Sequence, residues 1–165
     1  MPKLFRLKKG DKINRAIFEG ATINTPSKLA TEDYISALEW VKSIGGKQAM
    51  FDRADANAKV VKDWIEATPW LRNMVADPAK QTNTGVCMVF QGDYIAGLSA
   101  EDAAAVPKKI ASKLEEMDIG YDFNGYRDAP AGLRIWCGGS VESEDIKRLL
   151  PWIEWAYEEL KAGNL

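Results

Sequence analysis

The stretch GYRDAPAGLRIWCGG (residues 125–139) contains two arginines beside an apolar run. Arg127 lies among Gly and Pro residues, which are typical of a loop, whereas Arg134 opens the run Ile135–Cys137, which predicts a strand. A guanidinium is costly to bury unless an anion meets it. The stretch therefore predicts a strand whose first residues present an arginine to an anion.

Helical and strand patterns alternate along the rest of the chain. Apolar residues at helical spacing predict helices over residues 31–44, 47–67, 99–117 and 143–160. Short apolar runs predict strands over residues 71–76, 85–91 and 133–138. This order predicts an α/β (α+β) fold: a mixed or antiparallel sheet of three to four strands with helices packed on one face.

Hydroxyl side chains mark where three of these helices begin. Thr31 and Ser143 are predicted as N-caps, and Ser99 with Asp102 three residues later forms a capping-box pattern. The six tryptophans fall mostly on apolar faces, which favours the core over a binding surface.

The composition excludes several classes of function. The net charge of −2 argues against general affinity for nucleic acid or membrane surfaces. The chain has no histidine, which excludes histidine acid–base catalysis, Ser/His and Cys/His nucleophiles and nearly all zinc sites. Cys87 and Cys137 lie in separate apolar runs and are predicted to be buried free thiols. No apolar leader or membrane-length segment is visible, so we expect a cytoplasmic protein. Because the chain has no histidine, we expect no metal site.

Anion binding is the chemistry that the remaining residues support best. Arg127 and Arg134 offer guanidinium groups, which bind carboxylate or phosphate through two hydrogen bonds. The stretch NTPS (residues 24–27) offers an amide and two hydroxyls just ahead of a helix. The alternatives are that the arginines pair with Asp122 or Asp128 within the chain, and that NTPS is only a turn.

Four blocks resemble, in this order, the C-terminal part of the phosphoserine aminotransferase family: TINTPSKLATEDYISALEWVKSIGG, RADANAKVVKDWI, NTGVCMVF and YRDAPAGLRIWCGGSVESEDIKRLLPWIEWA. The family belongs to the class V aminotransferases, which are fold-type I pyridoxal-phosphate enzymes. The resemblance implies a homodimer that transfers an amino group between O-phosphoserine and 2-oxoglutarate in serine biosynthesis.

The resemblance also implies roles for individual residues. Arg134 would bind the α-carboxylate of the substrate. The adjoining His-Arg pair of the family reads Tyr126-Arg127 here, so Arg127 would face the phosphate or side-chain carboxylate, and Tyr126 replaces the histidine. Asn24 and Thr25 resemble the pair that reaches across the dimer interface to the cofactor phosphate.

The resemblance further implies that residues 1–30 are a stub of the large pyridoxal-phosphate domain with its linker, and that residues 31–165 are the small domain. The Schiff-base lysine and the other residues that hold the cofactor ring lie upstream in the family. We therefore expect a C-terminal fragment that is inactive alone, has no catalytic residue of its own and does not retain pyridoxal phosphate.

The alternative is a stand-alone, non-catalytic anion-binding or interaction domain with the same fold. An open reading frame that continues upstream of Met1 with a lysine-bearing segment would favour the enzyme. A start codon with its own ribosome-binding site would favour the alternative.

Overall fold

The computed structural model describes residues 7–22, 24–124 and 128–165, and it divides the chain into two compact units, Met1–Ile44 and Gly45–Leu165. This division lies later in the chain than the predicted boundary after residue 30. The assignment of residues 1–30 to a larger domain stays a prediction.

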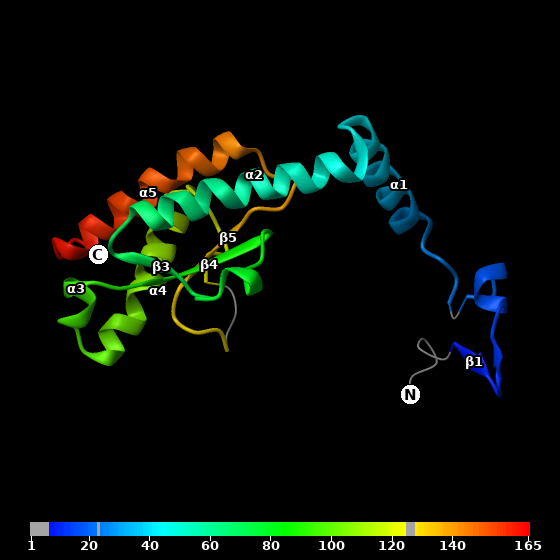
Figure 1. The fold of residues 1–165 in the computed structure, drawn as a ribbon, viewed down its shortest axis with the longest axis horizontal. Coiled ribbons are helices and arrows are strands. Elements are labelled where there is room, and N and C mark those ends of the chain that lie inside the picture. The colour runs from blue at the N-terminus through cyan, green and yellow to red at the C-terminus, as the bar shows by residue number, and fades with distance from the viewer. Residues whose placement is uncertain (1–6, 23, 125–127) are drawn as a thin grey trace. The chain divides into compact units, whose positions relative to one another are not determined.

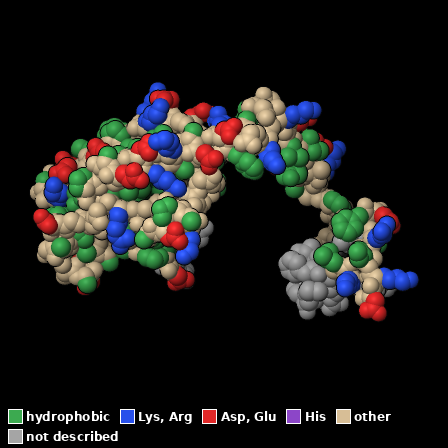
Figure 2. Space-filling view, viewed as in Figure 1, with side chains coloured by type: hydrophobic (Ala, Val, Ile, Leu, Met, Phe, Trp, Pro, Cys, Tyr) green, Lys and Arg blue, Asp and Glu red, His purple; other side chains and the backbone are tan. Residues whose placement is uncertain are grey.

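The first unit contains a short hairpin and one long helix. Strand β1 (Lys8–Lys9) pairs antiparallel with β2 (Lys12–Ile13), and Gly10 turns the chain between them in the left-handed region at φ 64°. A 3₁₀ helix, η2 (Ala16–Glu19), follows, and helix α1 spans Lys28–Ser43. Helix α1 buries none of its side chains, and hydrophobic side chains gather on its surface in Figure 2.

Helix α1 begins earlier than its sequence pattern predicts. Ser27 is the N-cap, and its Oγ accepts a hydrogen bond from the amide of Ala30 at 3.3 Å. Thr31 lies inside the first turn, where its hydroxyl donates to the carbonyl oxygen of Ser27 at 2.9 Å. The prediction of Thr31 as the N-cap is therefore wrong, because a second hydroxyl four residues earlier takes that role.

The second unit carries the predicted sheet and its helices (Figure 1). Its elements are α2 (Gly46–Ala67), β3 (Leu71–Asn73), the 3₁₀ helix η3 (Pro78–Lys80), β4 (Gly85–Phe90), α3 (Asp93–Ala96), α4 (Ala100–Glu116), β5 (Leu133–Trp136) and α5 (Ser143–Lys161). The strands form an antiparallel sheet in the order β3-β4-β5, and α5 contacts both α2 and α4. The predicted fold class is confirmed, and the short helix α3 is an addition to it.

Ser99 is confirmed as the N-cap of α4, but Asp102 bonds to the Ser99 hydroxyl, whereas a capping box uses the N-cap backbone amide. The Oγ of Ser99 accepts a hydrogen bond from the amide of Asp102 at 3.1 Å and donates to the Oδ2 of that residue at 2.7 Å. Asp102 also places a negative charge in the first turn, where the helix dipole favours it.

One face of the sheet forms the core of the second unit. Side chains alternate across a strand, and Val86, Met88, Leu133 and Ile135 are all buried on the same face. The buried side chains of α2, α4 and α5 pack against them, including Val61, Ile110, Leu114, Ile153 and Tyr157. Burying these apolar surfaces is the main force that holds the helices on this face.

The other face of the sheet is partly open to solvent. Cys87 lies opposite Arg134 in the ladder, and Gly85 lies opposite Trp136. Trp136 is 58% exposed, because alternation along β5 turns this ring away from Ile135. Trp40 and Trp152 are exposed as well, and Trp64, Trp70 and Trp155 are only partly buried against the core. The prediction that the tryptophans mostly lie in the core is therefore wrong. Cys137 is buried as predicted, and burial raises the pKa of its thiol to about 11, whereas Cys87 is only half-buried.

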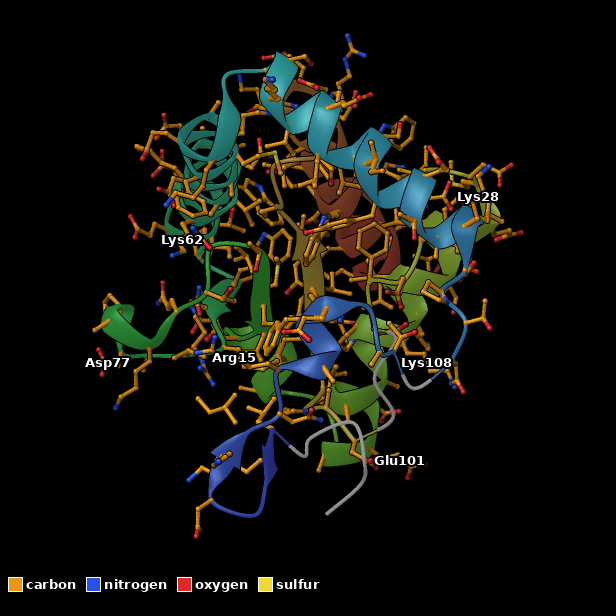
Figure 3. The ribbon with its side chains drawn as sticks, turned by 90° about the vertical axis from the view of Figure 1, so that its right-hand side faces the viewer. Arg15, Lys28, Lys62, Asp77, Glu101 and Lys108 are labelled. Carbon is orange, nitrogen blue, oxygen red and sulfur yellow. The ribbon has the colours of Figure 1, made fainter. Side chains whose placement is uncertain are left out.

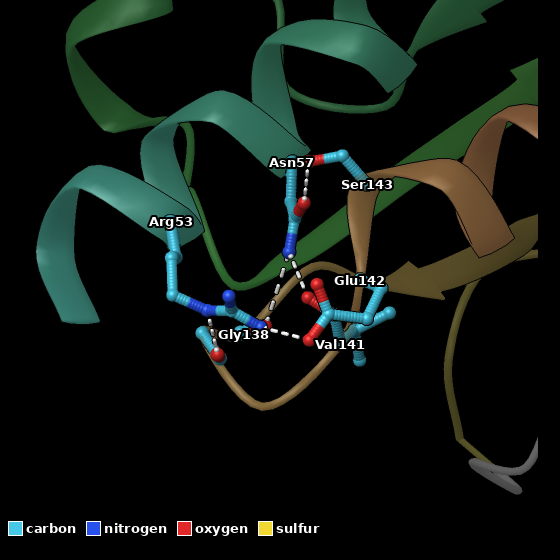
Figure 4. Close-up of polar contacts among 7 residues, drawn as sticks. Arg53, Asn57, Gly138, Val141, Glu142 and Ser143 are labelled. Carbon is cyan, nitrogen blue, oxygen red and sulfur yellow. Dashed lines mark hydrogen bonds and ion pairs between the residues drawn. The ribbon is translucent and has the colours of Figure 1, made fainter. Parts of the chain in front are cut away.

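A polar clamp ties the loop after β5 to helix α2 (Figure 4). The Nδ2 of Asn57 donates to the carbonyl oxygens of Gly138 at 3.2 Å and Val141 at 2.9 Å, and its Oδ1 accepts from the hydroxyl of Ser143 at 2.5 Å. Ser143 is therefore the first residue of α5 and not its N-cap, because its hydroxyl is directed to Asn57. Arg53 adds hydrogen bonds to the carbonyl oxygen of Gly139 and to Glu142.

We predict that Asn57→Ala lowers the free energy of unfolding by about 2–3 kcal/mol, because two carbonyl oxygens and a hydroxyl lose their buried partner. Asn83→Ala is the matched control, since Asn83 is exposed and bonds only to Asp55 among the described contacts; we expect it to change stability by less than about 0.5 kcal/mol. Urea unfolding followed by tryptophan fluorescence measures both. Equal losses of unfolding free energy in the two variants would contradict a stabilising role of Asn57 in the clamp.

Candidate anion site on the open face of the sheet

Arg134 is placed by the pairing of β5 with β4. Its neighbours Leu133 and Ile135 are buried in the core, so its side chain lies on the opposite face of the sheet. There it is half-buried, with 27% of the side chain exposed. A partly buried guanidinium needs an anionic partner, because desolvation without one is unfavourable.

Asp122 supplies such a partner from within the chain. The Nη2 of Arg134 donates to the Oδ2 of Asp122 at 2.6 Å. Of the two carboxylates that the sequence offered, the structure therefore shows Asp122 in this role. The Asp122 side chain is 67% exposed, so the ion pair is open to water.

The segment that carries Asp122 is anchored to β5. The backbone amide of Arg134 donates to the carbonyl oxygen of Phe123 at 2.7 Å, and the Phe123 ring is buried in the core. Asp122 adopts a left-handed backbone conformation at φ 61°, which Asp and Asn tolerate better than most residues. Nearby, Tyr121 donates its hydroxyl hydrogen to Asp118 at 2.5 Å, and this hydrogen bond raises the pKa of Tyr121.

Two cavities border Arg134. The first has a volume of about 450 Å³, and its lining includes Cys87, Lys108 and Arg134 together with the apolar side chains of Met74, Phe123 and Leu133. The second has a volume of about 470 Å³, and its lining includes Asp122, Arg134, Trp136 and Asp145. The guanidinium is thus reachable from outside the core, and the first cavity holds a second cation.

The other predicted site residues are either outside the described residues or in the first unit. Tyr126 and Arg127 lie outside the described residues. Asn24 and Thr25 are exposed in the segment before α1, which belongs to the first unit, whereas Arg134 belongs to the second.

Cys87 and Lys108 line the first cavity but were not predicted as site residues. The alternation of side chains in VCMVF and LRIW could have shown that Cys87 shares a face of the sheet with Arg134.

The described lysines are surface residues. Within residues 7–8, 10–16, 18–22, 24–124 and 128–165 the only buried polar or charged side chains are those of Asn57 and Thr68, so no lysine in these ranges is fully buried. Lys28, Lys62 and Lys108 lie on α1, α2 and α4 (Figure 3).

In the part of the chain that the structure describes, no three His, Cys, Asp or Glu side chains come together as metal ligands. No helix of the described chain is long and apolar enough to cross a membrane.

Comparison with known proteins confirms the resemblance that the sequence motifs indicate. No family model matches the chain. It is 42% identical to the phosphoserine aminotransferase of Methanosarcina mazei and 43% identical to that of Methanosarcina barkeri, over 161 residues in each case. These residues are 98% of this chain and 41% of each relative.

The solved structure of phosphoserine aminotransferase from Bacillus circulans subsp. alkalophilus has the same fold over the matched part. Its TM-score is 0.69 at 17% identity, with 87% of this chain and 36% of that chain covered. The chain is therefore homologous to phosphoserine aminotransferases and spans about two-fifths of the length of the curated relatives that it matches.

We predict that Gly132→Ala disturbs the site through the backbone. A Cβ at this position would collide with the carbonyl oxygen of Met88 and lie 2.9 Å from the Cε of Met74. We expect a loss of about 1–3 kcal/mol in the free energy of unfolding and shifted amide resonances along β5. Gly85→Ala is the control, because the nearest atom to its Cβ is the Cδ of Arg134 at 3.9 Å. Wild-type stability in Gly132→Ala would contradict the prediction.

Proposed function

We propose that this chain, homologous to phosphoserine aminotransferases over 98% of its length, forms the C-terminal small-domain part of such an enzyme. The proposed reaction of the whole protein is the transfer of an amino group between O-phosphoserine and 2-oxoglutarate in serine biosynthesis, by a cytoplasmic homodimer. The observation that carries the proposal is the position of Arg134, half-buried on the open face of the sheet and beside two cavities.

The charges of the two substrates fit a pair of arginines. O-phosphoserine carries a carboxylate and a phosphate, and 2-oxoglutarate carries two carboxylates. Arg134 would bind the α-carboxylate that both substrates share, through the two parallel hydrogen bonds that a guanidinium offers. Arg127 would bind the distal anion, with a hydrogen bond from the phenol of Tyr126. One pair of cations would thus serve both halves of the reaction.

The cofactor would be held partly from this chain. Pyridoxal phosphate, when bound, supplies an electron sink for negative charge at the α-carbon of the substrate. The amide of Asn24 and the hydroxyl of Thr25 are exposed hydrogen-bond donors that suit the cofactor phosphate of a partner subunit. By the resemblance, the covalent cofactor lysine lies upstream of the matched part in the family. We therefore propose that this lysine lies outside the chain, which would be inactive alone.

A second candidate is a stand-alone, non-catalytic anion-binding or interaction domain. It is favoured by one observation: Arg134, Asp122 and both cavities belong to the second unit alone. This candidate predicts the same anion binding but requires no cofactor.

We predict that the chain binds L-phosphoserine with millimolar affinity and that Arg134→Gln weakens binding at least tenfold. A charge-assisted bidentate contact contributes about 1.5–3 kcal/mol, which sets the expected loss. A titration followed by ¹H–¹⁵N NMR measures the affinity. Arg148→Gln is the matched control, since Arg148 is an exposed arginine of α5 near Asp145, and we expect unchanged binding. Equal affinities in the two variants would contradict the role of Arg134.

We also predict that pyridoxal phosphate labels the isolated chain only at scattered lysines. After incubation and borohydride reduction, peptide mapping should find substoichiometric labelling spread over the exposed lysines. Lysines in similar contact with water have similar reactivity, so we expect no single lysine to react preferentially. Stoichiometric labelling of a single lysine that is lost on adding phosphoserine would show a complete catalytic site in this chain and overturn the proposed inactivity.

A further inference from the structure

The carboxylate of Asp122 is paired with Arg134, the guanidinium proposed to bind the substrate carboxylate. Its Oδ2 lies 2.6 Å from the Nη2 of Arg134, although the two residues are 12 positions apart in the sequence. The contact is built by the fold, which brings the short Asp122 side chain within reach of the guanidinium. Asp122 precedes Phe123, whose ring is buried and whose carbonyl oxygen accepts the amide hydrogen of Arg134 itself at 2.7 Å.

The two partners of this ion pair differ in their exposure. The Asp122 side chain is 67% exposed, whereas that of Arg134 is 27% exposed and borders both cavities. Ion pairs with a solvent-exposed partner are weak, because water competes for the exposed group. The carboxylate can therefore leave for water at little free-energy cost. The half-buried guanidinium, in contrast, is stabilised when another anion takes the place of the carboxylate.

We propose that Asp122 is a displaceable internal occupant of the Arg134 site. In the absence of ligand its carboxylate pairs with the guanidinium, and the carboxylate of a small α-amino or α-keto acid replaces it on binding. Arg134 thus exchanges one charge-assisted hydrogen bond for another and keeps an anionic partner throughout. This inference rests on the proposed anion-binding role of Arg134.

Internal occupancy has a measurable consequence for affinity. A ligand binds only the fraction of molecules in which Arg134 is released, so the apparent dissociation constant rises by the inverse of that fraction. An exposed ion pair favours the paired state by a factor of about two to five. The released fraction is then about one third to one sixth, so removing the Asp122 carboxylate should tighten ligand binding by about three- to sixfold.

The test compares three variants in the L-phosphoserine titration. Asp122→Asn keeps the shape of the side chain and tolerates the left-handed backbone, while it removes the negative charge. Asp122→Gly removes the carboxylate by a second route and suits the same backbone conformation. Asp145→Asn is the control, because Asp145 lines the same 470 Å³ cavity and pairs with Arg148 instead.

We expect about three- to sixfold tighter binding for both Asp122 variants and unchanged binding for Asp145→Asn. The Nε–Hε resonance of Arg134 should shift in ligand-free Asp122→Asn, and thermal unfolding confirms that each variant is folded. Wild-type affinity in both Asp122 variants, or equal tightening in Asp145→Asn, would overturn the inference. Weaker L-phosphoserine binding by Arg134→Gln would in that case still support the anion-binding role of Arg134. If Arg134→Gln binds like the wild type, both the inference and the proposed role of Arg134 fail.

Discussion

The antiparallel pairing of β5 with β4 is the interaction on which the site depends. It places Leu133 opposite Met88 and Ile135 opposite Val86, and all four side chains are buried. Because side chains alternate, the same register sends Arg134 to the other face beside Cys87. A slip of one residue would turn the guanidinium into the core, where its desolvation would be strongly unfavourable. Burial of apolar neighbours therefore fixes the position of the charge.

Contacts at both ends of β5 keep this strand in place. At its start, Gly132 approaches the Met88 backbone so closely that no other residue fits without a shift. At its end, Asn57 binds two carbonyl oxygens of the following loop, and Arg53 binds a third together with Glu142. The backbone under Arg134 is thus held firmly, while its guanidinium faces cavities and an exposed carboxylate. This combination suits a binding site, because the ligand meets a group that is already oriented.

The lack of histidine shapes the proposed chemistry. A guanidinium stays charged over the whole physiological pH range, so recognition of anions by arginine does not depend on the titration of a protein side chain. Where the family has a histidine beside the distal arginine, this chain has Tyr126, whose phenol donates a hydrogen bond but carries no positive charge. In the proposed enzyme the distal anion would therefore depend more on Arg127 than it does in relatives with the histidine.

The sequence by itself determined the four long helices, the three strands of the sheet and the presence of an arginine at the start of β5, because periodicity is a local property; it did not predict the short helix α3. Local patterns failed where several similar residues compete for one role. Ser27 and not Thr31 caps α1, and the hydroxyl of Ser143 is directed to Asn57. Likewise the sequence offered both Asp122 and Asp128 to the arginines. Only the tertiary structure selected Asp122, because burial of Phe123 and its backbone bond to Arg134 bring that carboxylate to the guanidinium.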